Sequence, residues 1–197
     1  AKLLASPMRD VAVAGPALGE AHRQVGWYLA CEFLTLLIGI EECLISHVLV
    51  HRTTEFKLLH EQQTTIVALM RAGDPMASGV SNAFPSAMYV HAARPSDIKP
   101  HHVQNRKHIV LVDSIMNSGK TVMEFLQTIR SLEAKVRIVV VAGVVQAQCV
   151  SPESIAYRAF STCGNVSLVG LRLSDTKFTG SGTTDTGNRL FNTTHLL

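Results

Sequence analysis

The sequence predicts an α/β protein with a mostly parallel central sheet flanked by helices. Three runs rich in apolar and β-branched residues, at 65–70, 109–112 and 136–145, lack the alternation of a half-exposed strand, as is typical of parallel strands covered on both faces. Between the last two runs, residues 120–134 carry an apolar stripe at helical spacing. A strand, a helix and a second strand in this order predict a right-handed βαβ crossover.

Periodicity indicates three further elements. Residues 20–37 show the spacing of a helix that ends at Gly39. Residues 43–50 fit either a strand or a buried helix, because periodicity alone does not separate the two. Residues 166–173 form another strand candidate.

Two segments have little apolar periodicity. Residues 91–108 carry four histidines, two prolines and several basic residues, so we expect an exposed loop or flap there. The tail at 175–194 is rich in Gly, Ser and Thr. We expect this tail to form a small C-terminal hood over a site at the edge of the sheet.

Length and composition restrict the class of protein. The chain has 197 residues, of which 47% are hydrophobic and 17% charged, so we expect one compact domain over residues 1–197, which could be part of a longer polypeptide. A formal charge of +3 gives no reason to expect a nucleic-acid partner, and no apolar stretch is long enough to suggest a membrane partner. Four cysteines without CxxC spacing favour reduced thiols and a cytoplasmic location.

The run from Asp113 to Thr121 is the strongest candidate for a binding site. An apolar strand is followed by an acid, a short turn of small residues and a helix. The N–H groups at the start of a helix, together with the hydroxyls of Ser118 and Thr121, would form an anion site. Gly119 permits a positive φ, and Asp113 could accept hydrogen bonds from a ribose diol or help to hold a metal ion. The same pattern also fits an ordinary βα loop.

Gly119-Lys120-Thr121 also ends like a P-loop, which is a less favoured alternative. The first glycine of that motif would have to stand at position 114, which is Ser114. Without it, the loop lacks the backbone freedom to wrap a phosphate.

The histidines at positions 91, 101, 102 and 108 raise the question of a metal site. No acidic or cysteine ligand accompanies them in the sequence, so we expect solvated side chains and no protein-held metal.

Three stretches in order resemble one enzyme family. IVALMRAGDPM at 66–76, VDSIMNSGKT at 112–121 and TDTGNRLF at 184–191 are similar to the pyrophosphate loop, the 5-phosphoribosyl-1-pyrophosphate (PRPP) loop and the base-binding segment of the uracil phosphoribosyltransferase family. The helix containing His22 and Arg23 is also similar to the first helix of that family. The resemblance implies a phosphoribosyltransferase-type fold.

The resemblance also implies a reaction: uracil and PRPP give uridine monophosphate (UMP) and pyrophosphate in pyrimidine salvage, with Mg²⁺ bound to PRPP. It implies that Arg71, Asp113 and Asp185 are catalytic. The residues it implies for PRPP binding are Arg71, Arg94, Asp113, Ser114, Ile115, Met116, Asn117, Ser118, Gly119, Lys120, Thr121 and Asp185. Those it implies for uracil binding are Thr179, Thr184, Asp185 and Thr186. It further implies a homodimer or larger assembly, through the apolar first helix with Trp27, Tyr28 and Phe33.

The chain departs from the family pattern at several positions. Lys120 and Thr184 replace glycines, Asn188 replaces an aspartate, and Ser114 replaces a proline. The arm at 91–108 is shorter than in the family, so Arg94 aligns with the arginine of that arm only across a gap. These departures leave open an alternative, a catalytically retired PRPP- or nucleotide-binding regulatory domain, as in fused uridine kinase–phosphoribosyltransferase chains.

Overall fold

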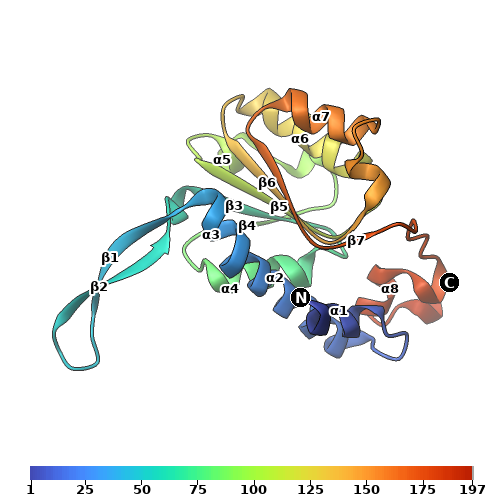
Figure 1. Cartoon of the computed structure of the whole chain (residues 1–197), viewed down its shortest axis with the longest axis horizontal. Helices are drawn as coiled ribbons and strands as arrows, with labels where there is room; N and C mark the ends of the chain where they lie inside the picture. The colour runs from blue at the N-terminus through green and yellow to red at the C-terminus, as the bar shows by residue number, and fades with distance from the viewer. Residues whose placement is uncertain (197) are drawn as a thin grey trace.

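The computed structural model describes residues 1–196, and a five-stranded parallel sheet forms its centre (Figure 1). The strands follow the order β4 (Met88–Ala92), β3 (Thr64–Leu69), β5 (His108–Met116), β6 (Arg137–Gln146) and β7 (Val166–Ser174). Every neighbouring pair in this sheet is parallel. The predicted α/β fold class and its strands are therefore confirmed.

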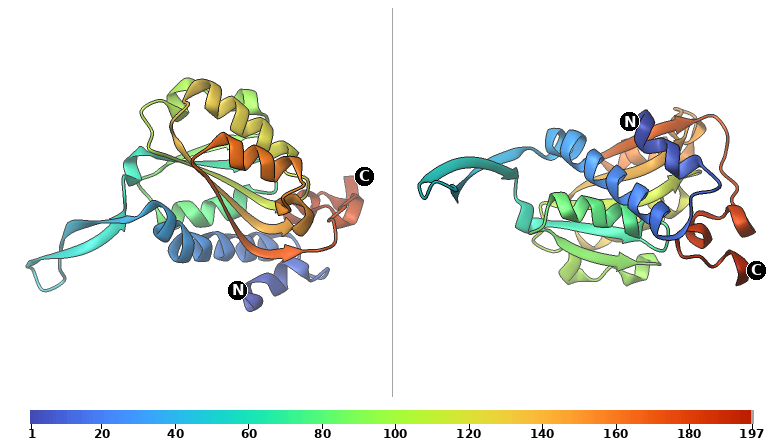
Figure 2. Two further views of the ribbon diagram at one scale, coloured as in Figure 1. Left: turned by 45° about the horizontal axis from the view of Figure 1, so that its top comes forward. Right: turned by 90° about the horizontal axis from the view of Figure 1, so that it is seen from below.

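Helices cover both faces of the sheet (Figure 2). One face carries α5 (Pro100–Val103), α6 (Lys120–Leu132) and α7 (Ile155–Cys163). The other carries α2 (Gly15–Leu29) and α4 (Asp74–Ala83). The predicted helix at 120–134 is thus confirmed as α6.

Strand β5 shows why its apolar run is continuous. Ile109 and Leu111 belong to the core beneath α6, whereas Val110 and Val112 belong to the core beneath α2 and α4. Successive side chains of a strand point to opposite faces, and all four of these are fully buried. A strand covered on both faces therefore needs apolar residues at every position.

The first long helix begins earlier than its periodicity predicts. Helix α2 starts at Gly15 with Pro16 in its first turn. The N–H groups of the first turn have no intrahelical acceptor, so the missing N–H of proline removes no helical hydrogen bond there. It continues through a π-helical turn, Ala30–Leu34, into α3 (Thr35–Ile38). Gly39, with φ of 100°, ends the run as expected.

A β-hairpin projects from the body of the molecule (Figure 2). Strands β1 (Ile40–Ser46) and β2 (Arg52–Leu58) pair in antiparallel fashion. Of the two alternatives for residues 43–50, the strand is right as far as Ser46 and the buried helix is wrong. Leu44 is 68% exposed, because a two-stranded ribbon that extends from the sheet has no layer to cover it.

The prediction of an exposed loop at residues 91–108 is right for the exposure of most of the segment, but the segment contains short regular elements. Strand β4 extends to Ala92, and a 3-10 turn at Pro95–Asp97 leads into α5. Ile98 and Val103 are buried against the α6 face. These elements are too short for a periodic pattern, so single apolar residues anchor them.

Helix α1 (Lys2–Arg9) was not expected from the sequence, and it packs on α2. After β7, the C-terminal segment (residues 175–196) contains a 3-10 turn at Gly182–Thr184, helix α8 (Thr186–Leu190) and a further turn at Thr194–Leu196. Two other 3-10 turns lie at Glu61–Gln63 and Ala147–Val150.

Helix α8 lies beside the end of α1, where Arg189 joins them (Figure 1). Its guanidinium donates to the backbone oxygens of Met8 at 3.5 Å, Asp10 at 2.5 Å and Val13 at 2.7 Å. The two ends of the chain are therefore joined near the carboxyl edge of the sheet. Among the described residues, no helix is long and apolar enough to span a bilayer.

Candidate active site

The candidate site lies at the carboxyl ends of β3 and β5. These two strands are neighbours in the sheet, and ligands of open α/β sheets bind at this edge. The loop after β3 carries Arg71, and the end of β5 carries Asp113 and the turn into α6.

The turn is shorter than the sequence suggests. Strand β5 continues to Met116, beyond the expected end at Val112, so only Asn117, Ser118 and Gly119 connect it to α6. Gly119 has φ of 72°. A Cβ on Gly119 would lie 2.9 Å from Cβ of Ala156 and 3.1 Å from Sγ of Cys149, so glycine is required there for space as well as for conformation.

The start of α6 offers backbone donors. Met123 N donates to Gly119 O at 2.9 Å, which closes the first turn of the helix. The N–H groups of Lys120, Thr121 and Val122 precede it and have no intrahelical acceptor. Among the residues that the structure describes, Lys120 N alone of these three has a side-chain acceptor, Ser118 Oγ at 3.4 Å. The helix dipole adds to this preference for an anion.

Lys120 does not fold into the turn. Its side chain is 79% exposed, and Nζ lies 4.0 Å from Oε1 of Glu124, one turn further along α6. Lys120, which stands where the family has a glycine, therefore does not cover the N–H groups at the start of α6.

Asp113 is half-buried in β5 and accepts a hydrogen bond from Ser114 N at 2.7 Å. Burial raises the pKa of Asp113 to about 6, against the opposing effect of the N–H groups of Ser114 and Ile115. A raised pKa in a carboxylate means that the fold has removed water from it without supplying a cationic partner. Such perturbed groups concentrate at functional sites.

The residues of this run differ in exposure. The side chains of Ser114 and Met116 are 1% and 2% exposed, whereas those of Asp113 and Ile115 are partly exposed. Ser114 and Met116 could therefore contact a ligand only through backbone atoms. The same geometry argues against a P-loop, because residues 113–116 form a strand where that motif needs a loop.

Arg71 stands in a loop that glycine brings close to β5. A Cβ on Gly73 would collide with the backbone oxygens of Val112 and Leu69, so only glycine allows this approach. The Arg71 guanidinium donates from Nη2 to Oδ1 of Asn188 at 2.9 Å and lies 5.6 Å from the ring centroid of Phe191. Arg71 is exposed and, among the described residues, forms no ion pair within 4 Å.

The C-terminal segment contacts both loops. Asn117 Nδ2 donates to Phe178 O at 2.8 Å, and Phe178 N donates to Asn117 Oδ1 at 3.0 Å. Asn188, which belongs to the same segment, accepts the hydrogen bond from Arg71. The segment therefore connects the turn before α6 with the loop after β3.

The remaining residues expected in the site differ in exposure. Asp185 caps α8 by accepting from Asn188 N at 2.8 Å. Thr179 and Thr184 are exposed, and the Thr184 hydroxyl bonds to Ser181, whereas Thr186 is buried. Arg94 is exposed two residues after β4, at the same edge of the sheet.

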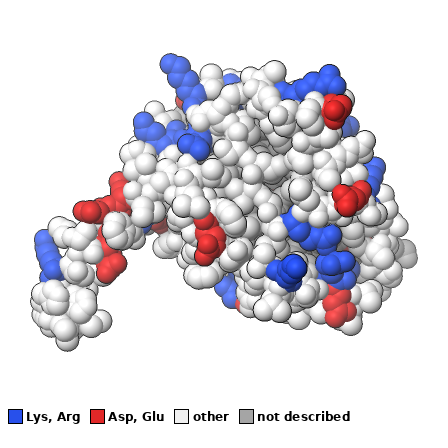
Figure 3. Space-filling view, in the orientation of Figure 1, with Lys and Arg blue, Asp and Glu red and all other residues white. Residues whose placement is uncertain are grey.

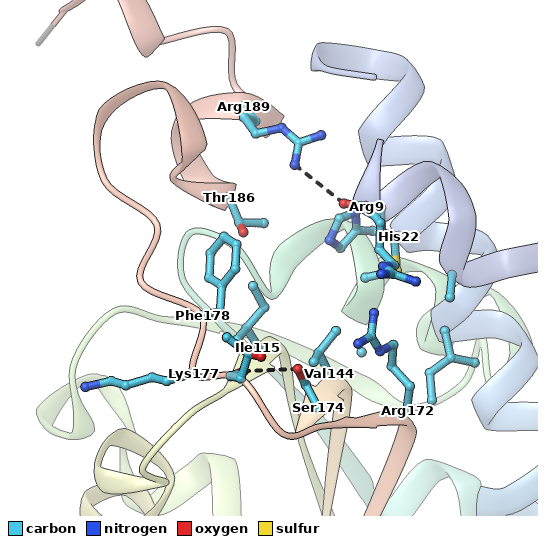
Figure 4. Close-up of a pocket in the computed structure, with 15 residues that line it drawn as sticks. Arg9, His22, Ile115, Val144, Arg172, Ser174, Lys177, Phe178, Thr186 and Arg189 are labelled. Carbon is cyan, nitrogen blue, oxygen red and sulfur yellow. Dashed lines mark hydrogen bonds between the residues drawn. The ribbon is translucent and has the colours of Figure 1, made fainter. Parts of the chain in front are cut away.

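A cavity of about 270 Å³ opens beside this site (Figure 4). Ile115, Phe178 and Thr186 lie to one side of it in Figure 4, and Arg9, His22 and Arg172 to the other. The sequence offered no signal that joins the second group, because its members stand on three separate elements, α1, α2 and β7. The space-filling view shows Lys and Arg side chains gathered around α1 (Figure 3).

A sequence profile described as uracil phosphoribosyltransferase matches residues 1–193. The chain belongs to the uracil phosphoribosyltransferase family. The family assignment makes the chain a phosphoribosyltransferase, as its three motifs implied. A comparison with curated protein sequences finds no match.

Two solved structures are similar to this chain to different degrees. The AQ2163 protein from Aquifex aeolicus superposes with a TM-score of 0.70 at 18% identity, covering 96% of this chain and 93% of that protein. Xanthine-guanine-hypoxanthine phosphoribosyltransferase from Helicobacter pylori gives a TM-score of 0.36 at 13% identity, covering 56% and 70%. The first of these likenesses supports the fold over nearly the whole chain.

Proposed function

We propose that the chain transfers a 5-phosphoribosyl group from PRPP to uracil and releases pyrophosphate. The observation that carries the proposal is the convergence of an open helix N-terminus, the half-buried carboxylate Asp113 and the cation Arg71 at one edge of the sheet. The helix N-terminus matches the 5-phosphate of PRPP, Asp113 matches the ribose diol, and Arg71 matches the pyrophosphate.

In this proposal the turn at 117–121 binds the 5-phosphate. The open N–H groups of Lys120, Thr121 and Val122 donate to its oxygens, with the Ser118 and Thr121 hydroxyls beside them. Asp113 accepts from the ribose hydroxyls, where a charged acceptor is stronger than a neutral one. Arg71 binds the pyrophosphate, because a planar guanidinium can donate to two oxygens of one phosphate group at once.

The chemistry is mainly electrostatic. The bond between C1′ and the pyrophosphate oxygen breaks, uracil N1 bonds to C1′, and the N1 proton is released. Positive charge grows on the sugar and negative charge on the leaving group, so Asp113 and Asp185 stabilise the first and Arg71 the second. The Asn188 amide is neutral, and it orients Arg71 without cancelling its charge.

We assign the uracil site to the C-terminal segment, acting as a hood. Backbone groups at Thr179, Thr184 and Thr186 would read the edge of the base, because main-chain donors and acceptors have fixed positions. The contacts between Asn117 and Phe178 support this role, since they hold the segment over the turn. The reaction returns a free base to the nucleotide pool, in agreement with pyrimidine salvage in the cytoplasm.

Mg²⁺ would be bound mainly by the substrate. Within residues 1–196 no cluster of three His, Cys, Asp or Glu side chains is arranged to hold a metal ion. Mg²⁺ in such sites commonly takes one or two carboxylates and the oxygens of the substrate phosphates, and Asp113 and Asp185 are the acids in the candidate site. When bound, the ion would reduce the negative charge of the leaving group.

The direct test is pyrophosphate release by the purified protein. We expect pyrophosphate and UMP to form in equal amounts from PRPP and uracil, and no release without a base. Release at the same rate without uracil, or none with it, would overturn the proposal.

We also propose a homo-oligomer, to which the hairpin contributes. Its outer end is largely uncharged (Figure 3), and Val48, Leu49 and Val50 are exposed there, as is Phe56 on β2. A two-stranded ribbon is marginally stable alone, and a large exposed apolar patch commonly marks an interface. Trp27 on α2 and Phe33 on the π-helical turn that follows α2 are exposed as well. Sedimentation should show a dimer or larger species that Phe56→Glu weakens; a monomer at micromolar concentration would contradict this.

A further inference from the structure

The side chain of Arg71 is held by the C-terminal segment. Arg71 stands in the loop after β3, but its Nη2 donates to Oδ1 of Asn188 at 2.9 Å, and its guanidinium lies 5.6 Å from the ring centroid of Phe191. A Cβ on Gly187 would lie 3.6 Å from the same Nη2, so the guanidinium also packs against the start of α8. The position of the pyrophosphate-binding cation therefore depends on the segment that we assign to the base.

Asn188 is fixed within the C-terminal segment on its other sides. Its Oδ1 also accepts from Oγ1 of Thr193 at 2.9 Å, and its Nδ2 donates to the backbone oxygen of Gly182 at 3.5 Å. Its backbone N donates to Oδ1 of Asp185 at 2.8 Å. Because a guanidinium only donates, the amide must turn its oxygen toward Arg71. The segment thus sets the orientation of the amide, and the amide sets that of the guanidinium.

Asn188 also stands between two opposite charges. It binds Asp185 through its N–H group and Arg71 through its amide oxygen. Both charged groups lie close to Gly187, where a Cβ would be 3.2 Å from Oδ1 of Asp185. Within residues 1–196 the two nevertheless form no ion pair within 4 Å. The neutral amide therefore leaves the charge of Arg71 free for an anion, at a position where the family has an aspartate.

We propose that Asn188 is a positioning residue that makes the binding of pyrophosphate and of the base cooperative, by fixing Arg71 to the C-terminal segment and keeping it apart from Asp185. This inference rests on the proposed function, in which the segment binds uracil and Arg71 binds pyrophosphate. A base that orders the segment thereby orders the guanidinium, and an anion that holds the guanidinium holds the segment. Coupling between two sites is reciprocal, so each ligand should strengthen the binding of the other.

A role in stability alone explains the Asn188 side chain less well. The backbone of Asn188 is already held by Asp185 and by Thr193 N, which donates to Asn188 O at 2.9 Å, and these bonds need no particular side chain. The bond to Arg71 joins exposed groups that are 117 positions apart in the chain. Such a bond adds little to stability, since ordering exposed side chains costs conformational entropy. Its main effect is to choose one direction for the guanidinium.

The test uses uracil and pyrophosphate together, a pair that cannot react because neither carries the ribose. Calorimetry with Mg²⁺ in the buffer would measure the Kd of pyrophosphate with and without excess uracil. We expect uracil to lower this Kd about 5- to 20-fold in wild-type protein, within the usual range of coupling between sites. Asn188→Ala should lose most of that coupling. Gln127→Ala, which removes an exposed amide of α6, is the matched control and should keep it.

Two further variants separate positioning from stability. Asn188→Asp keeps an acceptor for Arg71 and for Thr193, so it should melt at the wild-type temperature. Its added charge should nevertheless weaken pyrophosphate binding by about tenfold, because it pairs with the guanidinium that pyrophosphate needs. In Arg71→Gln protein, Asn188→Ala should change the Kd of pyrophosphate by less than about twofold, since a residue that acts through Arg71 has no further effect without it.

The outcomes separate this inference from the proposed function. If wild-type protein shows no uracil-dependent turnover of PRPP, the proposed function fails. If it turns over but uracil leaves the Kd of pyrophosphate unchanged, or if Asn188→Ala keeps the full coupling, the proposed function stands and Asn188 does not connect the two sites. Thermal melting identifies a misfolded variant. If Asn188→Ala does not fold, Asn188→Asp decides, and wild-type affinity for pyrophosphate in that variant would overturn the inference.

Discussion

The turn before α6 and the polar side of the cavity are built in opposite ways. The turn is continuous in sequence: one strand end, three residues and one helix start supply all of its donors. The side with Arg9, His22 and Arg172 combines residues from three elements far apart in the chain. A continuous site is set by local backbone geometry, whereas a dispersed site depends on how the elements pack.

This difference explains which parts of the site tolerate substitution. At the turn the binding groups are backbone N–H groups, so Lys120 can replace a glycine as long as its side chain points outward, as it does. On the dispersed side the polar groups are side chains, and each change alters the chemistry directly. The predictions below test this contrast, beginning with the largest expected effect.

Replacing Arg71 should cause the largest loss, since its charge opposes the departing pyrophosphate. We expect Arg71→Gln to reduce kcat by about 100- to 1,000-fold, the usual cost of removing one group that stabilises transition-state charge. Steady-state turnover of uracil and PRPP is the measurement. Arg158→Gln, on the exposed side of α7, is the matched control and should keep full activity; equal losses in the two variants would show that the Arg71 effect is not specific.

Replacing Asp113 should reduce activity and raise stability together. We expect Asp113→Asn to cost about 1.5–3 kcal/mol of charge-assisted hydrogen bonding, or roughly 10- to 100-fold in turnover. In wild-type protein, activity should fall as the pH drops through about 6, where Asp113 takes up its proton. Full turnover in the Asn variant would mean that the ribose lies elsewhere.

The stability effect has the opposite sign. The pKa of Asp113 in the fold, about 6, exceeds its ordinary value of 3.8, so ionisation destabilises the fold as the pH rises between those values. The cost at pH 7 is up to about 3 kcal/mol. Thermal melting of the unliganded Asn variant should therefore show an increase of several degrees at pH 7 and little change near pH 3.5. A lower melting temperature at pH 7 would contradict the burial of this carboxylate.

Asn117 tests the connection between the turn and the C-terminal segment. Asn117→Ala removes both hydrogen bonds to the Phe178 backbone, so the hood should become mobile while the N–H groups of α6 stay in place. We expect KM for uracil to rise by about 5- to 30-fold, from one to two hydrogen bonds of about 1 kcal/mol each, with KM for PRPP nearly unchanged. A rise confined to PRPP would reverse these assignments.

Lys120 should give the smallest effect. Its contact with Glu124 is an exposed i,i+4 pair, worth about 0.3–0.5 kcal/mol. Lys120→Ala should thus change PRPP affinity by less than about threefold, measured by calorimetry. A loss of tenfold or more would show that the side chain turns onto the ligand, which would make the turn dependent on a side chain after all.

The sequence predicted the elements whose patterns are long and continuous. The buried runs of β3, β5 and β6 and the stripe of α6 were found because each covers several consecutive positions. The short elements at 91–108 were missed, since Ile98 and Val103 are isolated anchors without a period. The exposure of β1 was missed because an apolar strand reads the same in a core and in a hairpin that extends from the body.

The candidate site was predictable to the extent that it is continuous. Arg71, Asp113 and the turn were identified from two local motifs, and the structure brings all of them to one edge of the sheet. The outward direction of Lys120, the burial of Ser114 and the raised pKa of Asp113 depend on packing. His22, Arg9 and Arg172 meet only because α1, α2 and β7 come together at the cavity, and no spacing in the chain encodes that.

A crystal structure of the chain with UMP tests the central claim most directly, because UMP carries one phosphate and one base and each must choose a region. We expect the phosphate at the N–H groups of Lys120, Thr121 and Val122, the ribose hydroxyls at Asp113, and the edge of the base toward the backbone of Thr179, Thr184 and Thr186. Density for the phosphate at Arg9 and Arg172, with the turn at 117–121 empty, would contradict the account.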